Sequence, residues 1–310
     1  MRMIQIMIFA AICAPAAAWA QTDTTVLFIG NSFTYGSGSS VRFYRADTVT
    51  DLNNTGIGGV PALFKSFTEQ VGSYYDVYLE TQPGSGLDFH LENRLGVIGR
   101  RAWDVVVMHG QSTLDFEAPG NPAKLIRNSG QLAEFLHAAN ADVEIHLTST
   151  WSRADQTYPP DGAWAGQPID AMAKDVRAGY DEAAQASPAI TSVVPVGEAW
   201  ARAMETGVAD PNPYDGTEFG TVDLWTYDHY HASTYGYYLE ALVVFGRLTG
   251  RDPRSLGDHE CSAFELGFSR EQAGALQLVA FETLVGTDGM TPAPFVLDNP
   301  ASQARCSGRR

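Results

Sequence analysis

A short apolar run that leads through a tight turn into a serine is the feature that most constrains the fold of this chain. Residues 26–29 read Val-Leu-Phe-Ile, and Gly30, Asn31 and Ser32 follow directly. Such a run, rich in β-branched and aromatic residues, is typical of a strand covered on both faces in an α/β sheet. In an open parallel sheet, ligands bind beyond the carboxyl ends of the strands. We therefore expect Ser32 at the edge of the sheet where chemistry takes place.

Four further apolar runs follow along the chain, separated by segments with helical periodicity. Strands that alternate with helices predict a parallel sheet with right-handed crossovers and helices on both faces. The sequence therefore predicts one domain over residues 21–310, a three-layer α/β/α sandwich of the flavodoxin-like type with a five-stranded parallel sheet. The expected strands are 26–29, 75–79, 105–108, 143–147 and 192–196, and the expected helices are 62–70, 91–100, 123–139, 169–185 and 233–248.

A second segment, about 190 residues after the first, supplies the partners that a serine nucleophile needs. Asp228 and His231 lie three residues apart, just before an apolar helical pattern. A serine hydroxyl is nearly inert at neutral pH until an imidazole takes its proton and a carboxylate orients that imidazole. An acid three residues before a histidine can fold back onto its ring. Ser32, His231 and Asp228 are therefore the expected nucleophile, general base and orienting acid.

Together, these two segments resemble the first and last blocks of the SGNH (GDSL-type) hydrolases. The first block reads Gly-Asn-Ser-Phe-Thr over 30–34, as in one branch of that superfamily, and the Asp-x-x-His block covers 228–231. The resemblance extends over most of the chain after the first twenty residues. It implies the three-layer fold and a two-step acyl transfer in which Ser32 attacks an ester and water releases the acyl group.

The resemblance also implies an oxyanion hole. Its second block is a glycine whose N–H points into the hole, which we place at Gly86, with Gly84 as the alternative. Its third block normally carries an asparagine after the third strand, where this chain has Gln111. A glutamine is one methylene longer, so the hole must have a different shape or the donor is weaker. The expected oxyanion donors are Ser32, Gly86 and Gln111.

Two loop insertions, near 35–58 and 149–168, are expected to shape the substrate pocket. Tryptophan and tyrosine residues in the second insertion and beside the last block offer flat faces for stacking on sugar rings or lining an acyl pocket. Packing of these rings against the core is the other explanation. The expected substrate-binding residues are Trp151, Arg153 and Tyr230, with Arg153 as the partner of a substrate anion.

The remaining histidines and glycines leave room for other kinds of site. His229 and His231 form a His-x-His pair, as in some metal sites, but no further ligand cluster of recognisable spacing accompanies them. His109 and His146 lie at or within expected strands, where a core or pocket-wall role is expected. The glycines of 56–59 do not form a dinucleotide or phosphate-binding motif after the first strand. No metal or cofactor is therefore expected.

The first twenty residues have the pattern of a secretory signal peptide. A basic residue precedes an apolar core at 4–14, and Ala-Trp-Ala ends at Ala20 before Gln21. A membrane anchor is the alternative, but the apolar run is shorter than the roughly 20 residues that a spanning helix needs. We expect cleavage after Ala20 and a secreted or periplasmic protein without a stable membrane anchor. In an oxidising compartment, Cys261 and Cys306 could form one disulfide.

The net charge of the chain limits the kinds of molecule that it is expected to bind. The formal charge is −16, from 36 acidic and 20 basic residues, which disfavours nucleic acid and anionic membranes. The expected function is an exported serine esterase acting on a small-molecule or carbohydrate ester, as a carbohydrate O-acylesterase or a short-chain carboxylesterase. A lipase or lysophospholipase is the alternative within the same chemistry. A carbohydrate-binding protein that kept the fold and lost turnover is the rival from another class. The sequence leaves the oligomeric state open.

Overall fold

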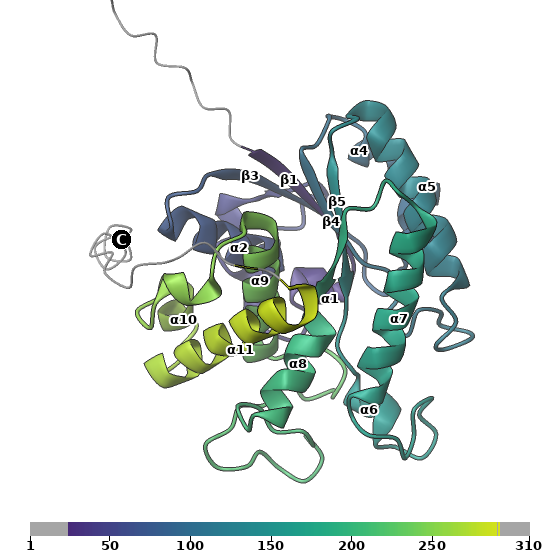
Figure 1. Ribbon diagram of the computed structural model, residues 1–310. Coiled ribbons are helices and arrows are strands. Elements are labelled where there is room, and N and C mark those ends of the chain that lie inside the picture. Colours follow the sequence, from purple (N-terminus) through teal and green to yellow (C-terminus); the bar gives the residue numbers. More distant parts are fainter. Residues whose placement is uncertain (1–23, 290, 292–310) are drawn as a thin grey trace, which may run out of the picture.

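The computed structural model describes residues 24–289 and 291, and its middle layer is a parallel sheet (Figure 1). The strand order is β2-β3-β1-β4-β5-β6. The expected α/β/α sandwich is confirmed, but the described sheet has six strands instead of five. The additional strand, β2, is a two-residue edge strand paired with β3, too short for periodicity to reveal. The strands are β1 (Thr24–Gly30), β2 (Thr50–Asp51), β3 (Tyr75–Thr81), β4 (Val105–Met108), β5 (Glu144–Ser149) and β6 (Ser192–Pro195).

Helices cover both faces of this sheet (Figure 1). One face carries α2 (Gly59–Gln70), α8 (Val196–Glu205), α9 (Thr234–Thr249) and α11 (Arg270–Asp288). The other face carries α3 (Leu87–Asn93), α5 (Ala123–Ala139) and α7 (Ala171–Ala186). The shorter helices are α1 (Ser32–Tyr35), α4 (Leu95–Ile98), α6 (Ala154–Thr157) and α10 (Cys261–Glu265), with 3₁₀ helices η1 (Ser40–Phe43), η2 (Ala46–Thr48) and η3 (Pro253–Leu256).

The central strand β1 divides the apolar interior into two cores. Successive side chains of a strand point to opposite faces. Val26 and Phe28 therefore pack in the core under α2 and α9, whereas Leu27 and Ile29 pack in the core under α5 and α7. Both faces of β1 are covered, which explains why its sequence is continuously apolar rather than alternating.

Several expected helices differ from those in the structure. The helix expected at 123–139 has those bounds, but the one expected at 91–100 begins earlier, at Leu87, and is interrupted at Arg94. Two long helices, α8 and α11, were not expected. A signal for α11 is present in the sequence, because Ser269 and Gln272 form a capping box at its start.

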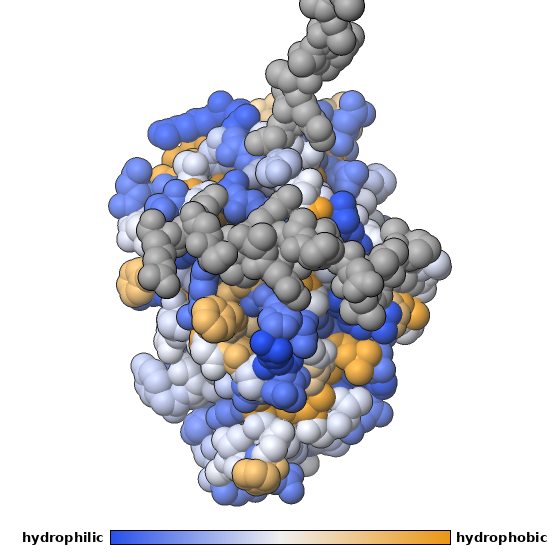
Figure 2. All heavy atoms as spheres, turned by 90° about the vertical axis from the view of Figure 1, so that its left-hand side faces the viewer, coloured by the Kyte–Doolittle hydropathy of each residue, from blue (hydrophilic) through white to orange (hydrophobic). Residues whose placement is uncertain are grey.

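Within the described residues, no helix is long and apolar enough to cross a membrane. The face shown in Figure 2 is largely hydrophilic, with smaller hydrophobic patches between the charged residues. The expected leader at 1–20 lies outside the described residues. Cys261 is buried at the start of α10, but Cys306 lies outside the described part of the chain, so their disulfide stays a prediction.

Candidate active site

Ser32 lies directly beyond the carboxyl end of β1, as its place in the sequence indicates. It is the first residue of the single-turn helix α1, and its relative exposure is 4%. Gly30 has no room for a side chain, since an added Cβ would lie 2.2 Å from Thr34 Oγ1 and 2.6 Å from His109 Nε2. Strand, turn and helix therefore follow one another tightly enough to hold Ser32 at this edge of the sheet.

The residue before the serine, Asn31, connects three segments of the site. Its side-chain oxygen accepts the N–H of Phe33, at 3.1 Å, and caps α1. Its amide nitrogen donates to the carbonyl oxygens of Ser85, at 2.8 Å, and Gly110, at 3.2 Å. Those carbonyls belong to the loops after β3 and β4, the two neighbours of β1 in the sheet. Asn31 thus fixes the nucleophile turn relative to both loops, a role that the sequence analysis did not assign.

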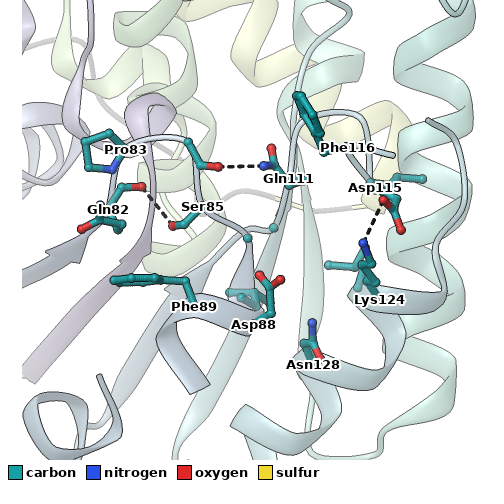
Figure 3. Close-up of a pocket in the computed structure, with 16 residues that line it drawn as sticks. Gln82, Pro83, Ser85, Asp88, Phe89, Gln111, Asp115, Phe116, Lys124 and Asn128 are labelled. Carbon is teal, nitrogen blue, oxygen red and sulfur yellow. Dashed lines mark hydrogen bonds and ion pairs between the residues drawn. The ribbon is translucent and has the colours of Figure 1, made fainter. Parts of the chain in front are cut away.

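Gly86 and Gln111, the expected oxyanion donors beside Ser32, lie next to each other on these two loops. A Cβ added to Gly86 would lie 3.5 Å from Gln111 Cγ and 3.7 Å from the Gln111 backbone nitrogen. The Gln111 side-chain nitrogen donates to the carbonyl oxygen of Gly84 at 2.8 Å (Figure 3). A primary amide has two N–H donors. One donor of Gln111 therefore remains for an oxyanion, while the other ties its loop to the loop of Gly84.

His231 and Asp228 form the hydrogen-bonded pair that their spacing predicts. His231 Nδ1 donates to Asp228 Oδ2 at 2.6 Å, and Asp228 Oδ1 accepts the backbone N–H groups of Tyr230 and His231 at 3.0 and 2.9 Å. Burial alone would raise the pKa of Asp228, but these hydrogen bonds outweigh it and lower the pKa. The charged carboxylate holds the proton on Nδ1. His231 Nε2 is buried and has no hydrogen-bond partner among residues 24–289 and 291, so it is left as an acceptor.

The His231 ring reaches the nucleophile turn through aromatic contacts. Its ring centroid lies 5.8 Å from that of Phe33, the residue after Ser32, and 4.0 Å from that of Tyr230. Phe33 in turn stacks on Trp151 with centroids 4.1 Å apart. The His231–Asp228 pair therefore contacts the residue that follows Ser32, although no hydrogen bond joins Ser32 to His231 in the described residues.

Trp151 does not offer a surface to a substrate. Its relative exposure is 0%, and its other face stacks on Trp200 at a centroid distance of 4.6 Å. Both ring faces are therefore covered by protein. Packing in the core, the alternative explanation for these aromatic residues, describes Trp151, and its expected contact with substrate is not supported by its position.

Arg153 and Tyr230 lie at the rim of the site, but the charge of Arg153 is already paired. Its guanidinium donates to both oxygens of Asp155, at 2.9 and 2.6 Å, and to Ser112 Oγ at 3.3 Å. It also covers the Tyr230 ring at 3.7 Å from the centroid. A substrate anion would have to compete with Asp155, so the structure favours Arg153 as a support for Tyr230 and, through it, for His231.

The other histidines occupy separate places. His229 packs its ring on Tyr214 at 4.1 Å, away from the His231–Asp228 pair. Among the described residues, no group of three or more His, Cys, Asp or Glu side chains is placed to hold a metal ion. His109 accepts the Thr34 hydroxyl at 2.7 Å, and His146 contacts Ser192 Oγ at 2.7 Å. Burial lowers the pKa of both His109 and His146 to about 4, so both are neutral residues of the interior.

A buried ionic cluster supports the end of β1 from the side of α3. His90 Nε2 contacts the Gly30 carbonyl oxygen at 3.1 Å, and His90 Nδ1 is hydrogen-bonded to Glu80. Glu80 also pairs with Arg94 Nε at 3.0 Å. Both Glu80 and His90 have a relative exposure of 0%. The sequence does not reveal this cluster, because nothing in the spacing of the three residues shows that they meet under β1.

No protein-family model matches the chain, and no curated protein matches its sequence. Among solved structures, a DUF4886 family protein from Bacteroides uniformis is similar at 16% identity and a TM-score of 0.58, covering 87% of this chain and 98% of that one. A candidate SGNH hydrolase from Slackia heliotrinireducens has 20% identity, coverage of 73% and 100%, and a TM-score of 0.49. The lipase/acylhydrolase from Enterococcus faecalis has 16% identity, coverage of 73% and 96%, and a TM-score of 0.46.

Of these three structures, the DUF4886 family protein has the highest TM-score, at 0.58. Its identity of 16% is too low to transfer an activity. It does extend over nearly the whole of that structure and most of this chain. The chain therefore shares its α/β/α fold with the DUF4886 family protein.

Proposed function

We propose that this protein is an exported serine esterase of the SGNH type, which hydrolyses carboxylic esters through an acyl-enzyme. The observation that carries the proposal is the His231–Asp228 pair beside the Ser32 turn. Its hydrogen bond of 2.6 Å holds the proton on Nδ1 and leaves Nε2 without a partner in the described part of the chain. That is the state in which an imidazole can accept the proton of a serine hydroxyl.

In the proposed mechanism, Ser32 Oγ attacks the ester carbonyl carbon while its proton passes to His231 Nε2. The tetrahedral oxyanion accepts hydrogen bonds from the Ser32 and Gly86 N–H groups and from the Gln111 side chain. His231 then gives its proton to the leaving alcohol, and the acyl group stays on Ser32. A water molecule, deprotonated by His231, releases the acid and restores the serine.

The adjacency of Gly86 and Gln111 supports this arrangement, because both lie on loops that Asn31 ties to the nucleophile turn. Preorganised donors of this kind act only when charge develops on the substrate oxygen, which is where they lower the barrier. Within this chemistry we propose carbohydrate O-acylesterase or short-chain carboxylesterase activity.

The test is hydrolysis of 4-nitrophenyl esters from acetate to decanoate, and of acetylated xylan, by residues 21–310, with Ser32→Ala in parallel. We expect wild-type turnover that is lost in Ser32→Ala. A rate that rises with acyl length would replace the short-chain assignment with a lipase. Sugar binding without any ester cleavage would contradict the proposal and favour the non-catalytic rival, for which the engagement of Gln111 with Gly84 would be the structural reason.

A further inference from the structure

A pocket of about 350 Å³ lies directly beside the expected oxyanion hole (Figure 3). Gly86 and Gln111 line it, together with residues of α3, α5 and the loops after β3 and β4. An ester whose carbonyl oxygen lies at Gly86 and Gln111 would therefore lie at the edge of this pocket, which neither Ser32 nor His231 lines. The polar groups of the pocket indicate what kind of group it can bind.

Asn128, on α5, is a buried polar side chain directed into the pocket. Its relative exposure is 5%, yet its amide nitrogen donates no hydrogen bond within residues 24–289 and 291. Figure 3 shows this nitrogen pointing toward the space between Asp88 and Lys124. The amide nitrogen is open to the pocket, where it can donate to water or to a ligand. The pocket is the side from which a partner of Asn128 can come.

Asp88, on α3, places a carboxylate at the junction of the pocket and the expected oxyanion hole. A Cβ added to Gly86 would lie 2.8 Å from Asp88 Oδ1. No hydrogen bond or ion pair of the Asp88 carboxylate occurs in the described part of the chain. A free carboxylate is an acceptor only, so beside a reacting ester it suits hydroxyl groups and repels anions.

The opposite wall carries a cation and an aromatic ring. Lys124 pairs with Asp115 at 3.1 Å, and Asp115 Oδ1 also accepts the backbone N–H of Glu117 at 2.8 Å. Phe116, which lies between Asp115 and Glu117 in the sequence, is 80% exposed at the rim of the pocket. A large exposed ring at a pocket entrance supplies an apolar face beside the polar groups.

The loop that carries this wall contains backbone strain. Leu114 has a φ of +67°, in the left-handed region that is rare for residues other than glycine, asparagine and aspartate. Its buried side chain fits because Gly179 leaves room, since a Cβ there would lie 2.8 Å from Leu114 Cδ1. Strain of this kind persists where the surrounding structure holds the residue in place. Leu114 sets the direction of the loop between Gln111 and Asp115.

We infer that this pocket binds a sugar unit of an acylated carbohydrate, an inference that rests on the proposed esterase function. Hydroxyl groups of a sugar can donate to Asp88 and accept from the Asn128 amide, and Phe116 can cover an apolar face of the ring. An alkyl chain would fill the apolar part of the pocket but make no hydrogen bond with Asn128 or Asp88, so these two groups favour a ligand with hydroxyl groups. The volume of about 350 Å³ lies within the range of small-molecule sites.

The experiment compares two substrates in the same protein: 4-nitrophenyl acetate, whose leaving group has no hydroxyl groups other than the one released, and a mono-O-acetylated methyl β-xylopyranoside. The measured quantity is the ratio of kcat/KM for the sugar ester to kcat/KM for 4-nitrophenyl acetate. Loss of one hydrogen-bonding partner should lower this ratio about tenfold or more in Asn128→Leu and in Asp88→Ala. Glu92→Ala, one helical turn after Asp88 and absent from the pocket lining, is the matched control and should keep the wild-type ratio.

An unchanged ratio in both Asn128→Leu and Asp88→Ala would overturn the inference. A rise of kcat/KM from 4-nitrophenyl acetate to decanoate that Asn128→Leu enhances would also overturn it, because the pocket would then hold the acyl chain. Thermal melting of each variant identifies a folding defect in Asn128→Leu, and the exposed Asp88 keeps the test valid in that case.

A binding measurement separates failure of this inference from failure of the esterase proposal. Calorimetric titration of Ser32→Ala with methyl β-xylopyranoside and xylobiose needs no turnover. Binding that Asn128→Leu weakens about tenfold or more supports the subsite even if no ester is hydrolysed. Absence of sugar binding, with intact hydrolysis of 4-nitrophenyl acetate by the wild type, overturns the subsite and leaves the esterase proposal standing.

Discussion

The two sides of Ser32 are built in different ways. On one side, which we call the polar side, Asn31 and His90 are hydrogen-bonded to backbone carbonyls of the turn and its neighbouring loops, and His109 to the Thr34 hydroxyl. On the other, the aromatic side, Phe33, Trp151, Tyr230 and His231 contact one another mainly through their rings. The expected oxyanion donors thus belong to the polar side and the proposed general base to the aromatic side.

This difference matters because the two kinds of contact respond differently to change. Hydrogen bonds are directional, and a buried partner left unpaired costs about 1–3 kcal/mol. Apolar packing is non-directional and tolerates swaps that conserve volume. We therefore expect the polar side to fail sharply when one group is removed, and the aromatic side to fail only where a hydrogen bond orients the proposed general base, as between His231 and Asp228.

Asp228→Asn tests that contact and should have the largest effect. An asparagine of the same shape keeps the packing but can hold His231 in the wrong tautomer, so kcat should fall by about 10³- to 10⁴-fold. The measurement is steady-state hydrolysis of 4-nitrophenyl acetate. Asp223→Asn is the matched control, because Asp223 caps the backbone of Trp225 at 2.9 Å and does not touch His231. Similar losses in both variants would contradict the assignment of Asp228.

Asn31→Ala breaks the polar side at its centre. It leaves the Ser85 and Gly110 carbonyls without their amide donor, so we expect about 3–4 kcal/mol less free energy of unfolding and a much lower kcat. Denaturant unfolding and 4-nitrophenyl acetate hydrolysis measure the two effects. Asn140→Ala is the control, since the Asn140 amide donates to the Trp103 carbonyl at 2.8 Å away from the site. It should lose stability and keep kcat; equal kcat values in the two variants would exclude a positioning role for Asn31.

Asn31 and Trp151 also show which features of the structure can be predicted from the sequence and which cannot. The triad candidates, the fold and the bounds of α5 follow from local patterns, such as a strand before a serine or an acid three residues before a histidine. Two of the three hydrogen bonds of Asn31 reach loops far along the chain, and no spacing in the sequence reveals them. Likewise, Trp151 lies near the start of the expected loop insertion at 149–168, and the local sequence is the same whether its ring lines a lid or fills the core.

Gln111→Ala removes one donor of the expected oxyanion hole and should have an intermediate effect. Loss of one such donor costs about 3 kcal/mol of activation free energy, or roughly a 10²-fold lower kcat, without abolishing turnover. Gln111→Asn tests the reach of the longer side chain, because it keeps the amide and shortens it by one methylene. Unchanged turnover of Gln111→Ala would remove Gln111 from the mechanism.

Acid should weaken the polar side through His109. Burial lowers the pKa of His109 to about 4, below that of an unfolded histidine near 6.5. Below pH 6.5 the unfolded chain binds a proton that the folded protein does not, so this stability is present above pH 6.5 and is lost as the pH falls toward 4, on the order of 2–3 kcal/mol. His109→Gln should flatten the dependence of the unfolding free energy on pH between 7 and 4. His146→Gln, with a similar shift but no place in the site, should flatten it equally while keeping kcat. An unchanged slope in both variants would contradict their neutral burial.

Trp151→Phe changes the aromatic side while keeping an aromatic ring between Phe33 and Trp200, and it should have the smallest effect. The indole N–H donates to the Tyr230 carbonyl at 3.3 Å, so its loss and the smaller ring should cost about 1–2 kcal/mol of unfolding free energy. Because the contacts to Phe33 are non-directional, the ring of His231 should keep its orientation through Asp228, and kcat should change by less than about threefold. A loss of kcat as large as that of Gln111→Ala, at a temperature where the variant is fully folded, would show that ring packing, and not the hydrogen bond to Asp228, sets the position of the general base. Substitutions on the aromatic side would then lower kcat as much as those on the polar side, and the distinction between the two sides would fail.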